Sequence, residues 1–447
     1  MTSFTGDALD QANARPLYRS LPWITGMGAF LDVYTIASLG ASVFSVVPSL
    51  HISSTTFALI AVLVQLGALV GALILGRITD AYGRRLIFLL DMVLFIIFAL
   101  LSAISTNVTE LAVFRFLTGL AIGADFAPAL SLLAEYSPKK IRGSMMAKFF
   151  IFFGAGGMVA EILGAILFHY FGTAPIQWRL MMVSAVVPAG IGLVARISLA
   201  ESPRWLEAQG RSVEAADALK KSVGVSLDAN KLAGEKKISF GNAFLTKGTL
   251  FIVLPLAFVM LLSVPGEGSL TAFGPVIFGT LGIQRFYTLI YTGLLFFGGQ
   301  AIGGGIGAVM SDRVGRVRSY MTASIVMIVF AFLLYFFGTH VYATLALVFI
   351  FAVASFIWNA IVYPWPVELF PVQTRGTGEG INIAMNRLGL VLGTEITPFI
   401  LPVYKLEGLF AIFGVLLIVG TLIGFFTLRR TGAVEGKSLE EIAVGNQ

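Results

Sequence analysis

The stretch Gly76-Arg77-Ile78-Thr79-Asp80-Ala81-Tyr82-Gly83-Arg84-Arg85 is a charged turn between two long apolar runs. A weaker copy, Asp312-Arg313-Val314-Gly315-Arg316, follows about 230 residues later. A second motif repeats at nearly the same distance, because Glu135-Tyr-Ser-Pro138-Lys-Lys-Ile-Arg142-Gly143 shares its skeleton with Glu368-Leu-Phe-Pro371-Val-Gln-Thr-Arg375-Gly376. Two motifs repeated in one order predict two similar halves. Such duplication inside an apolar chain is typical of membrane transporters.

The composition places the chain in a lipid bilayer. Of its 447 residues, 57% are hydrophobic and only 12% are charged, whereas soluble domains carry about 25% charged residues. The net charge of +6 does not indicate nucleic-acid binding, because the basic residues stand in short loops between apolar runs. The absence of cysteine excludes disulfides, thiol catalysis and cysteine-ligated metal sites.

Apolar runs long enough to cross a bilayer, about 20 residues each, occur six times in each half. The sequence therefore predicts an all-α integral membrane protein with twelve transmembrane helices. The predicted spans are 20–47, 54–76, 86–105, 109–136, 143–171 and 177–199, followed by 249–280, 286–310, 319–338, 341–369, 376–402 and 407–428.

Lysine and arginine predict the orientation, because they concentrate on one side of the predicted spans. This places both termini in the cytoplasm and makes the chain a multi-pass protein of the cell membrane. We divide it into a first bundle (1–199), a cytoplasmic helical linker (200–248), a second bundle (249–430) and a cytoplasmic tail (431–447). Within the linker, Ser212 to Lys221 reads as an amphipathic helix with Ser212 as its N-cap.

Opposite charges at the cytoplasmic span ends predict a closing device. In each half a basic turn is followed about 55 residues later by an acidic residue at a span end. Surface ion pairs are individually weak, about 0–1 kcal/mol, yet several breaking together can bias a two-state equilibrium. Anchoring by the positive-inside rule is the simpler alternative. We call this set the gate cluster: Asp80, Arg84, Arg85, Glu135, Arg142, Glu201, Arg204, Asp312, Arg313, Arg316, Glu368 and Arg375.

These motifs, together with Glu201-Ser-Pro-Arg204-Trp-Leu, resemble the signatures of the major facilitator superfamily. They look most like the branch that holds the sugar porters and the metabolite:proton symporters. The resemblance covers nearly the whole chain. It implies two six-helix bundles related by a pseudo-two-fold axis, with alternating access to a central cavity.

Ionisable side chains deep inside predicted spans are functional candidates by default, because they are costly in lipid. Asp32 lies in the first span, and Arg115 and Asp125 share the fourth. We expect these carboxylates to exchange protons while an arginine competes for them. A static ion pair that joins helices is the alternative.

The same three residues resemble the proton-handling set of the phosphate:proton symporters. Sugar porters likewise pair a first-span aspartate with a fourth-span arginine, which implies an Asp32–Arg115 pair. Arg387 falls where the phosphate group has a lysine, and Asn359 where it has a substrate-contacting asparagine. That group's fourth-span tyrosine and fifth-span glutamine are replaced here by Phe126 and Phe153, and the seventh-span ligands of both groups are missing.

Further polar residues are weaker candidates for the cavity. Glu267 interrupts the seventh span between Pro and Gly, so it is a candidate for an outer gate, a second proton site or a wetted unwound segment. We expect Glu161 and Glu395 at the outer rim, and Asp91, Lys148 and Glu379 with the gate cluster. The remaining cavity candidates are Asn382, Asn386 and Trp365.

The sequence thus favours a proton-coupled symporter of a small polar metabolite: a carboxylated metabolite, a sugar acid or a sugar. Phosphate:proton symport and a non-transporting nutrient sensor are the alternatives. No catalytic motif or nucleotide-binding loop indicates an enzyme, and the three distant histidines suggest no metal site. We expect no cofactor and no nucleic acid. The expected partners are the substrate, protons and membrane lipid, with the chain as a monomer.

Overall fold

The computed structural model describes residues 15–138, 141–225, 247–369 and 375–431, and these residues form helices joined by short turns without a strand. The first half of the chain forms eight of these helices, and Pro22, Pro48 and Pro128 are accommodated inside them. Its elements are α2 (Arg15–Gly40), α3 (Val43–Ser49), α4 (Ser54–Tyr82), α5 (Arg84–Ile104), α6 (Val108–Tyr136), α7 (Arg142–Phe171), α8 (Pro175–Ser184) and α9 (Val186–Ile197).

The second half begins after the linker helices α10 (Pro203–Ala208) and α11 (Ser212–Val223). Two of its spans are broken, and after each break a proline occupies the first helical position, where it is favoured: Pro265 starts α15 and Pro364 starts α20. Its elements are α14 (Lys247–Ser263), α15 (Pro265–Gly279), α16 (Arg285–Tyr291), the π-helix η1 (Thr292–Phe297), α17 (Gly298–Arg313), α18 (Arg316–Phe337), α19 (Val341–Val362), α20 (Pro364–Leu369) and α21 (Arg375–Thr431).

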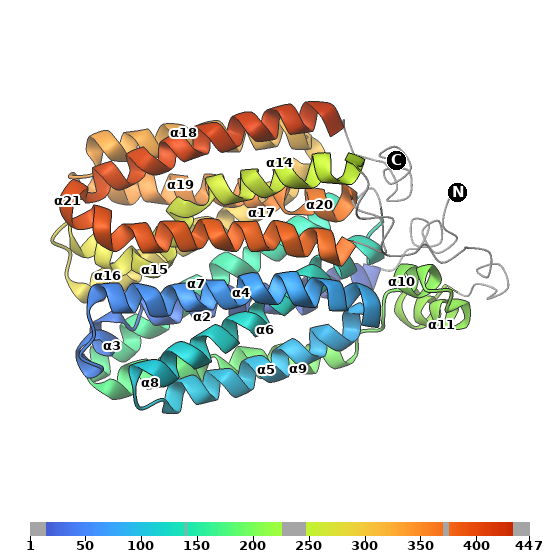
Figure 1. Cartoon of the computed structure of the whole chain (residues 1–447), viewed down its shortest axis with the longest axis horizontal. Helices are drawn as coiled ribbons and strands as arrows, with labels where there is room; N and C mark the ends of the chain where they lie inside the picture. The colour runs from blue at the N-terminus through green and yellow to red at the C-terminus, as the bar shows by residue number, and fades with distance from the viewer. Residues whose placement is uncertain (1–14, 139–140, 226–246, 370–374, 432–447) are drawn as a thin grey trace.

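The described helices account for the twelve predicted spans. Ten of them are long and apolar enough to cross a membrane, and the bent pair formed by α2 and α3 adds an eleventh. The twelfth comes from α21, which reverses at Lys405, where the backbone is not helical (φ 53°, ψ −163°). Figure 1 shows α21 as two rods that meet at one end of the molecule, with α14 between them in this view. The expected tail, 431–447, lies outside the described residues apart from Thr431.

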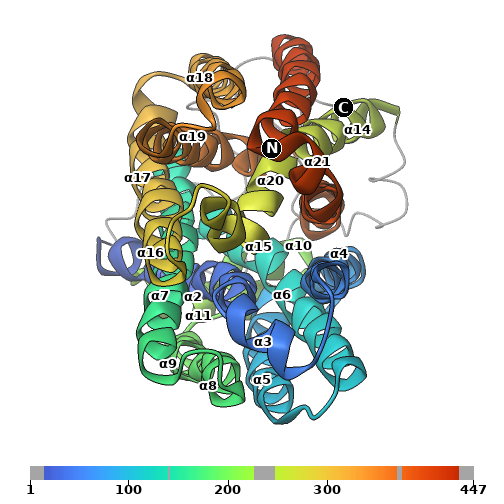
Figure 2. The same ribbon diagram turned by 90° about the vertical axis from the view of Figure 1, so that its left-hand side faces the viewer.

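The spans form two groups that face each other (Figure 2). One group holds α2 to α9 and the other holds α14 to α21. Two pairs of helices make the main contacts between the groups: α4 packs on α21, and α7 packs on η1 and α17. The two all-helical bundles confirm the predicted fold class.

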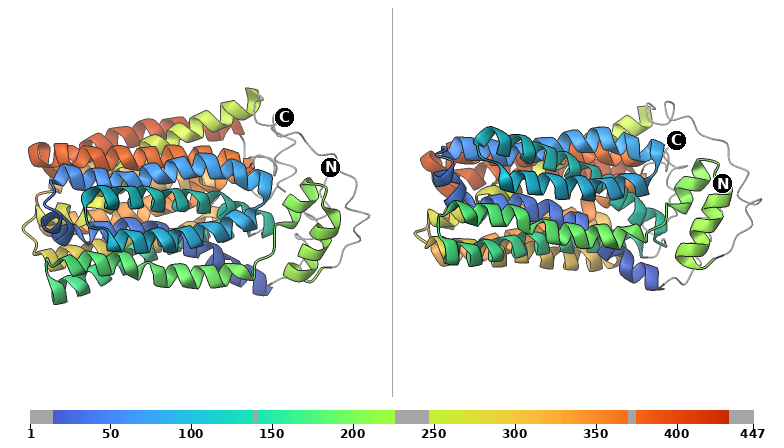
Figure 3. Two further views of the ribbon diagram at one scale, coloured as in Figure 1. Left: turned by 60° about the horizontal axis from the view of Figure 1, so that its bottom comes forward. Right: turned by 90° about the horizontal axis from the view of Figure 1, so that it is seen from below.

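The linker helices α10 and α11 lie beyond one end of the bundles (Figures 1 and 3). We call this the linker end, and the other the far end. Helix α11 covers the predicted amphipathic segment, but Arg211 rather than Ser212 occupies its N-cap position and no side chain caps it. Ser212 instead lies in the first turn, so the N-cap prediction was wrong.

The opening stretch of sequence forms the tight turn between α4 and α5 at the linker end. Gly83 has φ +105°, which residues with a side chain rarely adopt. The backbone N–H groups of Arg84 and Arg85 then both donate to the carboxylate of Glu201, each at 3.0 Å. The glycine therefore lets the start of α5 bind the segment that leads into the linker.

Candidate functional site

A small cavity lies between the two bundles. Its volume is about 40 Å³, which is room for a few water molecules, whereas ligand pockets usually measure about 300–1,000 Å³. The structure is therefore closed around this cavity. Its polar lining comes from both bundles and consists of Gln65, Glu267, Thr271, Gln300, Asn359, Tyr363, Asn386 and Arg387.

Asp32 and Arg387 form an ion pair at this cavity, and it joins the first bundle to the second. Both side chains are buried. Arg387 on α21 donates from both terminal nitrogens to the two carboxylate oxygens of Asp32 on α2, with Nη1 3.2 Å from Oδ1. The same Nη1 donates to Oε1 of Gln65 on α4 at 3.1 Å. The cation is thus held by a carboxylate and an amide, in the fork geometry that favours arginine over lysine.

The expected Asp32–Arg115 pair is not formed. Arg115 is buried on α6, where Nη2 donates to the carbonyl oxygen of Thr35 at 2.8 Å and Nη1 lies 3.7 Å from the sulfur of Met182. The packing of the two bundles brings Arg387, and not Arg115, to the carboxylate of Asp32. Arg387 therefore contacts the aspartate directly and is not left free in the cavity.

A second polar pair lines the cavity within the second bundle. Asn359 on α19 donates to Oε1 and Oε2 of Glu267 at 2.9 and 3.2 Å, and both residues are buried. The break between α14 and α15 places Glu267 in the first turn of α15. There the positive end of a helix favours a carboxylate.

Aromatic rings close the cavity on one side. The ring centres of Phe126 and Tyr363 lie 5.7 Å apart with the rings tilted by 31°, and the guanidinium of Arg387 lies 5.3 Å from the centre of the Phe126 ring. Phe150 and Phe153 on α7 are parallel at 5.7 Å and belong to the cavity wall. A desolvated cation over an aromatic face is attracted by about 2 kcal/mol. Of the two phenylalanines in the phosphate-symporter positions, Phe153 therefore belongs to the apolar wall of the cavity, and Phe126 packs against Phe153 and Tyr363 outside the lining.

Asp125 belongs to a different buried cluster. Its Oδ1 lies 2.6 Å from Nη2 of Arg196 on α9, and Nη1 of Arg196 lies 2.9 Å from Oδ2 of Asp91 on α5. One guanidinium thus serves two carboxylates. Asp91 is therefore not part of the gate cluster, contrary to expectation, because α5 turns it toward Arg196.

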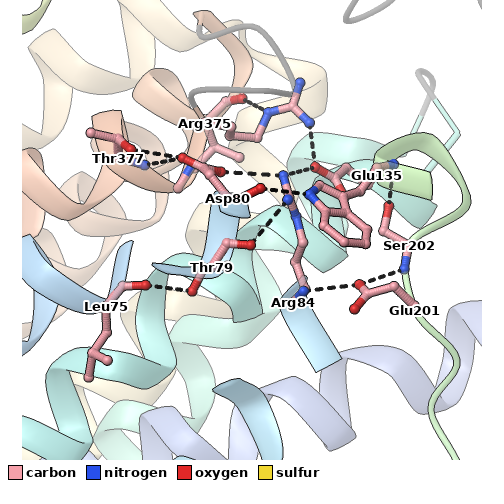
Figure 4. Close-up of polar contacts among 12 residues, drawn as sticks. Leu75, Thr79, Asp80, Arg84, Glu135, Glu201, Ser202, Arg375 and Thr377 are labelled. Carbon is pink, nitrogen blue, oxygen red and sulfur yellow. Dashed lines mark hydrogen bonds and ion pairs between the residues drawn. The ribbon is translucent and has the colours of Figure 1, made fainter. Parts of the chain in front are cut away.

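The gate cluster does cross between the bundles at the linker end (Figure 4). Asp80 at the end of α4 accepts from the backbone N–H groups of Gly376 and Thr377, at 3.0 and 2.8 Å. Thr377 adds its hydroxyl at 2.9 Å. The first turn of α21 thus supplies the donors that are unpaired at any helix start, and Asp80 accepts them.

Glu135 connects the same two bundles by ion pairs. Its Oε1 lies 3.1 Å from Nη2 of Arg84 and 2.9 Å from Nη1 of Arg375, and all three side chains are buried. Arg375 also donates from Nε to the carbonyl oxygen of Val367 at 2.7 Å. These are buried pairs, so the surface-pair energies expected from the sequence do not apply to them.

The other members of the gate cluster differ in how far their side chains are buried. Arg142 and Arg204 are buried near this end, Arg316 is buried, and Arg313 is exposed. The side chains of Asp312 and Glu368 lie outside the described residues. Lys148 is exposed, and Glu379 is fully buried with no hydrogen-bond partner on either oxygen among the described residues, so neither joins the cluster as expected.

Several cavity predictions differ from the structure. Trp365 packs on Tyr320 at 5.6 Å and does not line the cavity, because the helix break at Tyr363 turns that tyrosine inward instead. Asn382 is buried outside the lining, whereas Asn386, one turn further along α21, belongs to it. Glu161 is fully buried and not at a rim.

Sequence reasoning missed Gln65, Gln300, Thr271 and Arg196. The two glutamines and Arg196 stand alone inside apolar runs, which is the same signal that singled out Asp32. Thr271 carries no such signal, because threonine is common in membrane helices.

The comparisons with known proteins find sugar and metabolite transporters. The family model described as "Sugar (and other) transporter" matches residues 20–445. The inner membrane metabolite transport protein YgcS of Escherichia coli K12 is 28% identical over 429 residues, covering 94% of this chain and 92% of the relative. The arabinose-proton symporter of Bacillus subtilis is 27% identical over 448 residues, covering 93% and 92%.

A solved structure has the same fold. It is the proton:xylose symporter XylE of the major facilitator superfamily, bound to 6-bromo-6-deoxy-D-glucose, and it superimposes with a TM-score of 0.84. The match covers 97% of this chain and all of that one, at 20% sequence identity.

Proposed function

The chain belongs to the sugar (and other) transporter family of the major facilitator superfamily, and on that premise we propose proton-coupled symport of a small polar metabolite. The observation that carries the proposal is the ion pair between Asp32 and Arg387 at the cavity. A transporter of this kind needs one group that binds a proton and a second group whose contacts change when the proton binds. Asp32 is the first of these groups and Arg387 is the second.

The coupling step follows from the geometry of the pair. When Asp32 binds a proton it loses its negative charge, and Arg387 loses the counter-charge that holds it. The freed guanidinium then binds an anionic or strongly hydrogen-bonding substrate, which a neutralised Asp32 no longer opposes. Proton and substrate thus bind together, and release of the proton restores the ion pair and expels the substrate.

The lining indicates a carboxylated sugar, or sugar acid, as the substrate. Arg387 can bind a carboxylate by two parallel hydrogen bonds. Amide groups from both bundles suit hydroxyl groups, since each offers donors and an acceptor. These amides are Gln65, Gln300, Asn359 and Asn386.

We place the linker end in the cytoplasm, because lysine and arginine concentrate at the span ends there. The gate cluster then closes the cytoplasmic side. Asp125, which shares Arg196 with Asp91, is a second candidate for proton exchange. The chain acts as a monomer surrounded by lipid, without a cofactor and without catalysing a reaction.

Uptake into proteoliposomes tests the proposal, with a panel of sugar acids, neutral sugars and inorganic phosphate and with or without an inward proton gradient. We expect Asp32→Asn to lose gradient-driven accumulation while it still exchanges labelled substrate across the membrane. Glu214→Gln on the exposed face of α11 is the matched control and keeps accumulation. Full accumulation by Asp32→Asn contradicts the coupling role. Uptake of neutral sugars alone, or of phosphate alone, replaces the sugar-acid assignment.

A further inference from the structure

Glu161 is a buried carboxylate that the coupling step does not use. It lies on α7, its side chain is fully buried, and neither carboxylate oxygen has a hydrogen-bond partner in the described part of the chain. An ionised carboxylate in such a place costs several kcal/mol, so the closed structure holds Glu161 as the neutral acid.

Glu161 lies where the two bundles meet, between the cavity and the far end. Phe153, which lines the cavity, is eight residues earlier on α7, or about 12 Å along a helix. The residue facing Glu161 across the interface is Gly293 in η1, where an added Cβ would lie 3.1 Å from the Cβ of Glu161. Opening of the cavity toward the far end has to loosen this contact.

The surrounding interface is tightly packed. On α7, a Cβ at Gly154 would come within 2.5 Å of the carbonyl oxygen of Phe297, so the two backbones touch where α7 meets the second bundle. The opposing segment, Thr292–Phe297, is a π-helix, a form that often marks functional sites in membrane and soluble helices alike. Glu161 therefore has no route to water while this interface is closed.

The charged groups on the neighbouring elements are engaged elsewhere. The π-helix η1 has no titratable side chain. On α16, the guanidinium of Arg285 lies over the ring of Phe44 at 5.1 Å. On α2, Asp32 is paired with Arg387, and on α8, Arg179 donates to the carbonyl oxygen of Ala103 at 2.6 Å. The other titratable groups on these elements and on the outer part of α7 are Arg15, Tyr18, Arg19, Tyr34, Tyr287, Tyr291, His169 and Tyr170. Helix α17 also packs on α7, and its titratable residues, Asp312 and Arg313, stand at its linker end.

We propose that Glu161 is a further proton-binding site, separate from Asp32 and Asp125, which must be protonated before the far side of the transporter closes. The inference rests on the proposed alternating access. In the open conformation water reaches the carboxylate, which then ionises; in the closed conformation only the neutral acid fits. Because the closed state binds this proton more tightly, a low pH outside favours closure and a high pH holds the empty carrier open.

Thiol labelling tests this, because the natural chain has no cysteine. Thr271→Cys introduces one thiol at the cavity, and a membrane-impermeant maleimide added from the far side labels it only when that side is open. Rates are divided by those of Thr55→Cys, an exposed position at the far end, which corrects for the pH dependence of the reagent. We expect labelling to be about tenfold slower at about pH 5.5 than at about pH 8.

When Glu161→Gln is added to the Thr271→Cys variant, we expect the thiol to be labelled slowly at both pH values. The matched control Glu395→Gln, a half-buried glutamate on α21, keeps the pH response of the parent. Asp32→Asn also keeps that response, so failure of the coupling role and failure of this inference give different results. A Glu161→Gln variant with the pH response of the parent overturns the proposal.

Infrared difference spectra between the two pH values give a second test that does not depend on labelling. The parent should show a protonated-carboxyl band that is lost in both Glu161→Gln and Glu161→Leu. A band that persists unchanged in both variants overturns the proposal.

Discussion

At the level of single residues, several buried charges in this protein are paired with opposite charges on other helices. Asp32 and Arg387 stand 355 residues apart, and Asp125 and Arg196 belong to different helices of the first bundle. A buried ion pair adds little net stability, but the loss of one partner leaves an uncompensated charge. Protonation of the carboxylate in such a pair therefore leaves a buried arginine without its counter-charge, which favours a change of structure.

The Asp32–Arg387 pair should be visible in unfolding experiments. Asp32→Asn leaves Arg387 without its counter-charge, and we expect a loss of about 3–5 kcal/mol in the free energy of unfolding. Asp32→Asn combined with Arg387→Gln should lose much less than the sum of the single variants, because no charge is then stranded. Thermal unfolding in detergent measures the cycle. Additive losses would show that the two side chains do not interact.

At the level of elements, the gate depends on how α4, α5 and α21 begin and end. The turn at Gly83 starts α5 so that its first N–H groups reach Glu201, while the start of α21 reaches Asp80. Helix ends are the only places in a span where backbone groups are left for such contacts. The gate is therefore made where the helices stop.

Gly83→Ala should destabilise the protein by about 1–3 kcal/mol, because φ +105° strains any residue with a Cβ. Gly305→Ala is the matched control: its position in α17 has open space around it, and alanine is the better helix former by about 1 kcal/mol. Thermal unfolding of the two variants decides the comparison. Equal melting temperatures would contradict a special role for the turn.

Glu135→Gln should open the linker end. It leaves Arg84 and Arg375 close together without the carboxylate between them, which weakens the closed state by roughly 3–5 kcal/mol. We expect Thr271→Cys labelling from the linker side to rise more than about tenfold, since 1.4 kcal/mol corresponds to a factor of ten.

The control for this experiment is Glu214→Gln on α11. Its partner Arg211 lies 2.6 Å away in an exposed pair, and hydrogen bonds from Arg211 lower the pKa of Glu214 below its usual value. Exposed pairs contribute little, so labelling should stay at the parent rate. Equal labelling of Glu135→Gln and Glu214→Gln would show that the buried pairs do not hold the gate.

At the level of the whole molecule, the closed cavity requires the bundles to move. A volume of about 40 Å³ cannot accept a sugar-sized ligand, so binding has to follow opening at one end. The contacts at the linker end hold the bundles together there, and the packing of α7 on η1 does so toward the far end. Transport then consists of breaking one set of contacts while the other is made.

A cross-link at the linker end should stop transport. Asp80→Cys and Thr377→Cys place two thiols where the native side chains are in hydrogen-bond contact, at 2.9 Å. A short, cleavable thiol cross-linker should abolish uptake, and reduction should restore the rate of the untreated double variant. Each single-cysteine variant treated with the same reagent is the control. Undiminished uptake by the cross-linked protein would contradict alternating access.

Much of the fold could be predicted from the sequence. The thickness of the bilayer sets how many consecutive apolar residues a span needs, and such runs are visible in the sequence itself. Runs of apolar residues gave helices whose ends agree with the structure within a few residues, as at Val108–Tyr136 and Arg142–Phe171. Pro265 marks a break that the sequence also indicated. Asp32 and Arg387 were recognised as buried charges, since a lone charge in an apolar run is visible without coordinates.

The partners of those charges could not be predicted from the sequence. Arg115 and Arg387 are both arginines in apolar spans, and only the rotation and apposition of α2, α6 and α21 decide which of them reaches Asp32. In the same way, whether Glu161 lies at a rim or inside an interface depends on how α7 packs against η1. Hydropathy and the repeat determine which segments cross the membrane, because each helix satisfies its own backbone hydrogen bonds. Ion pairs and buried interfaces join residues far apart in the chain, so only the tertiary structure decided them.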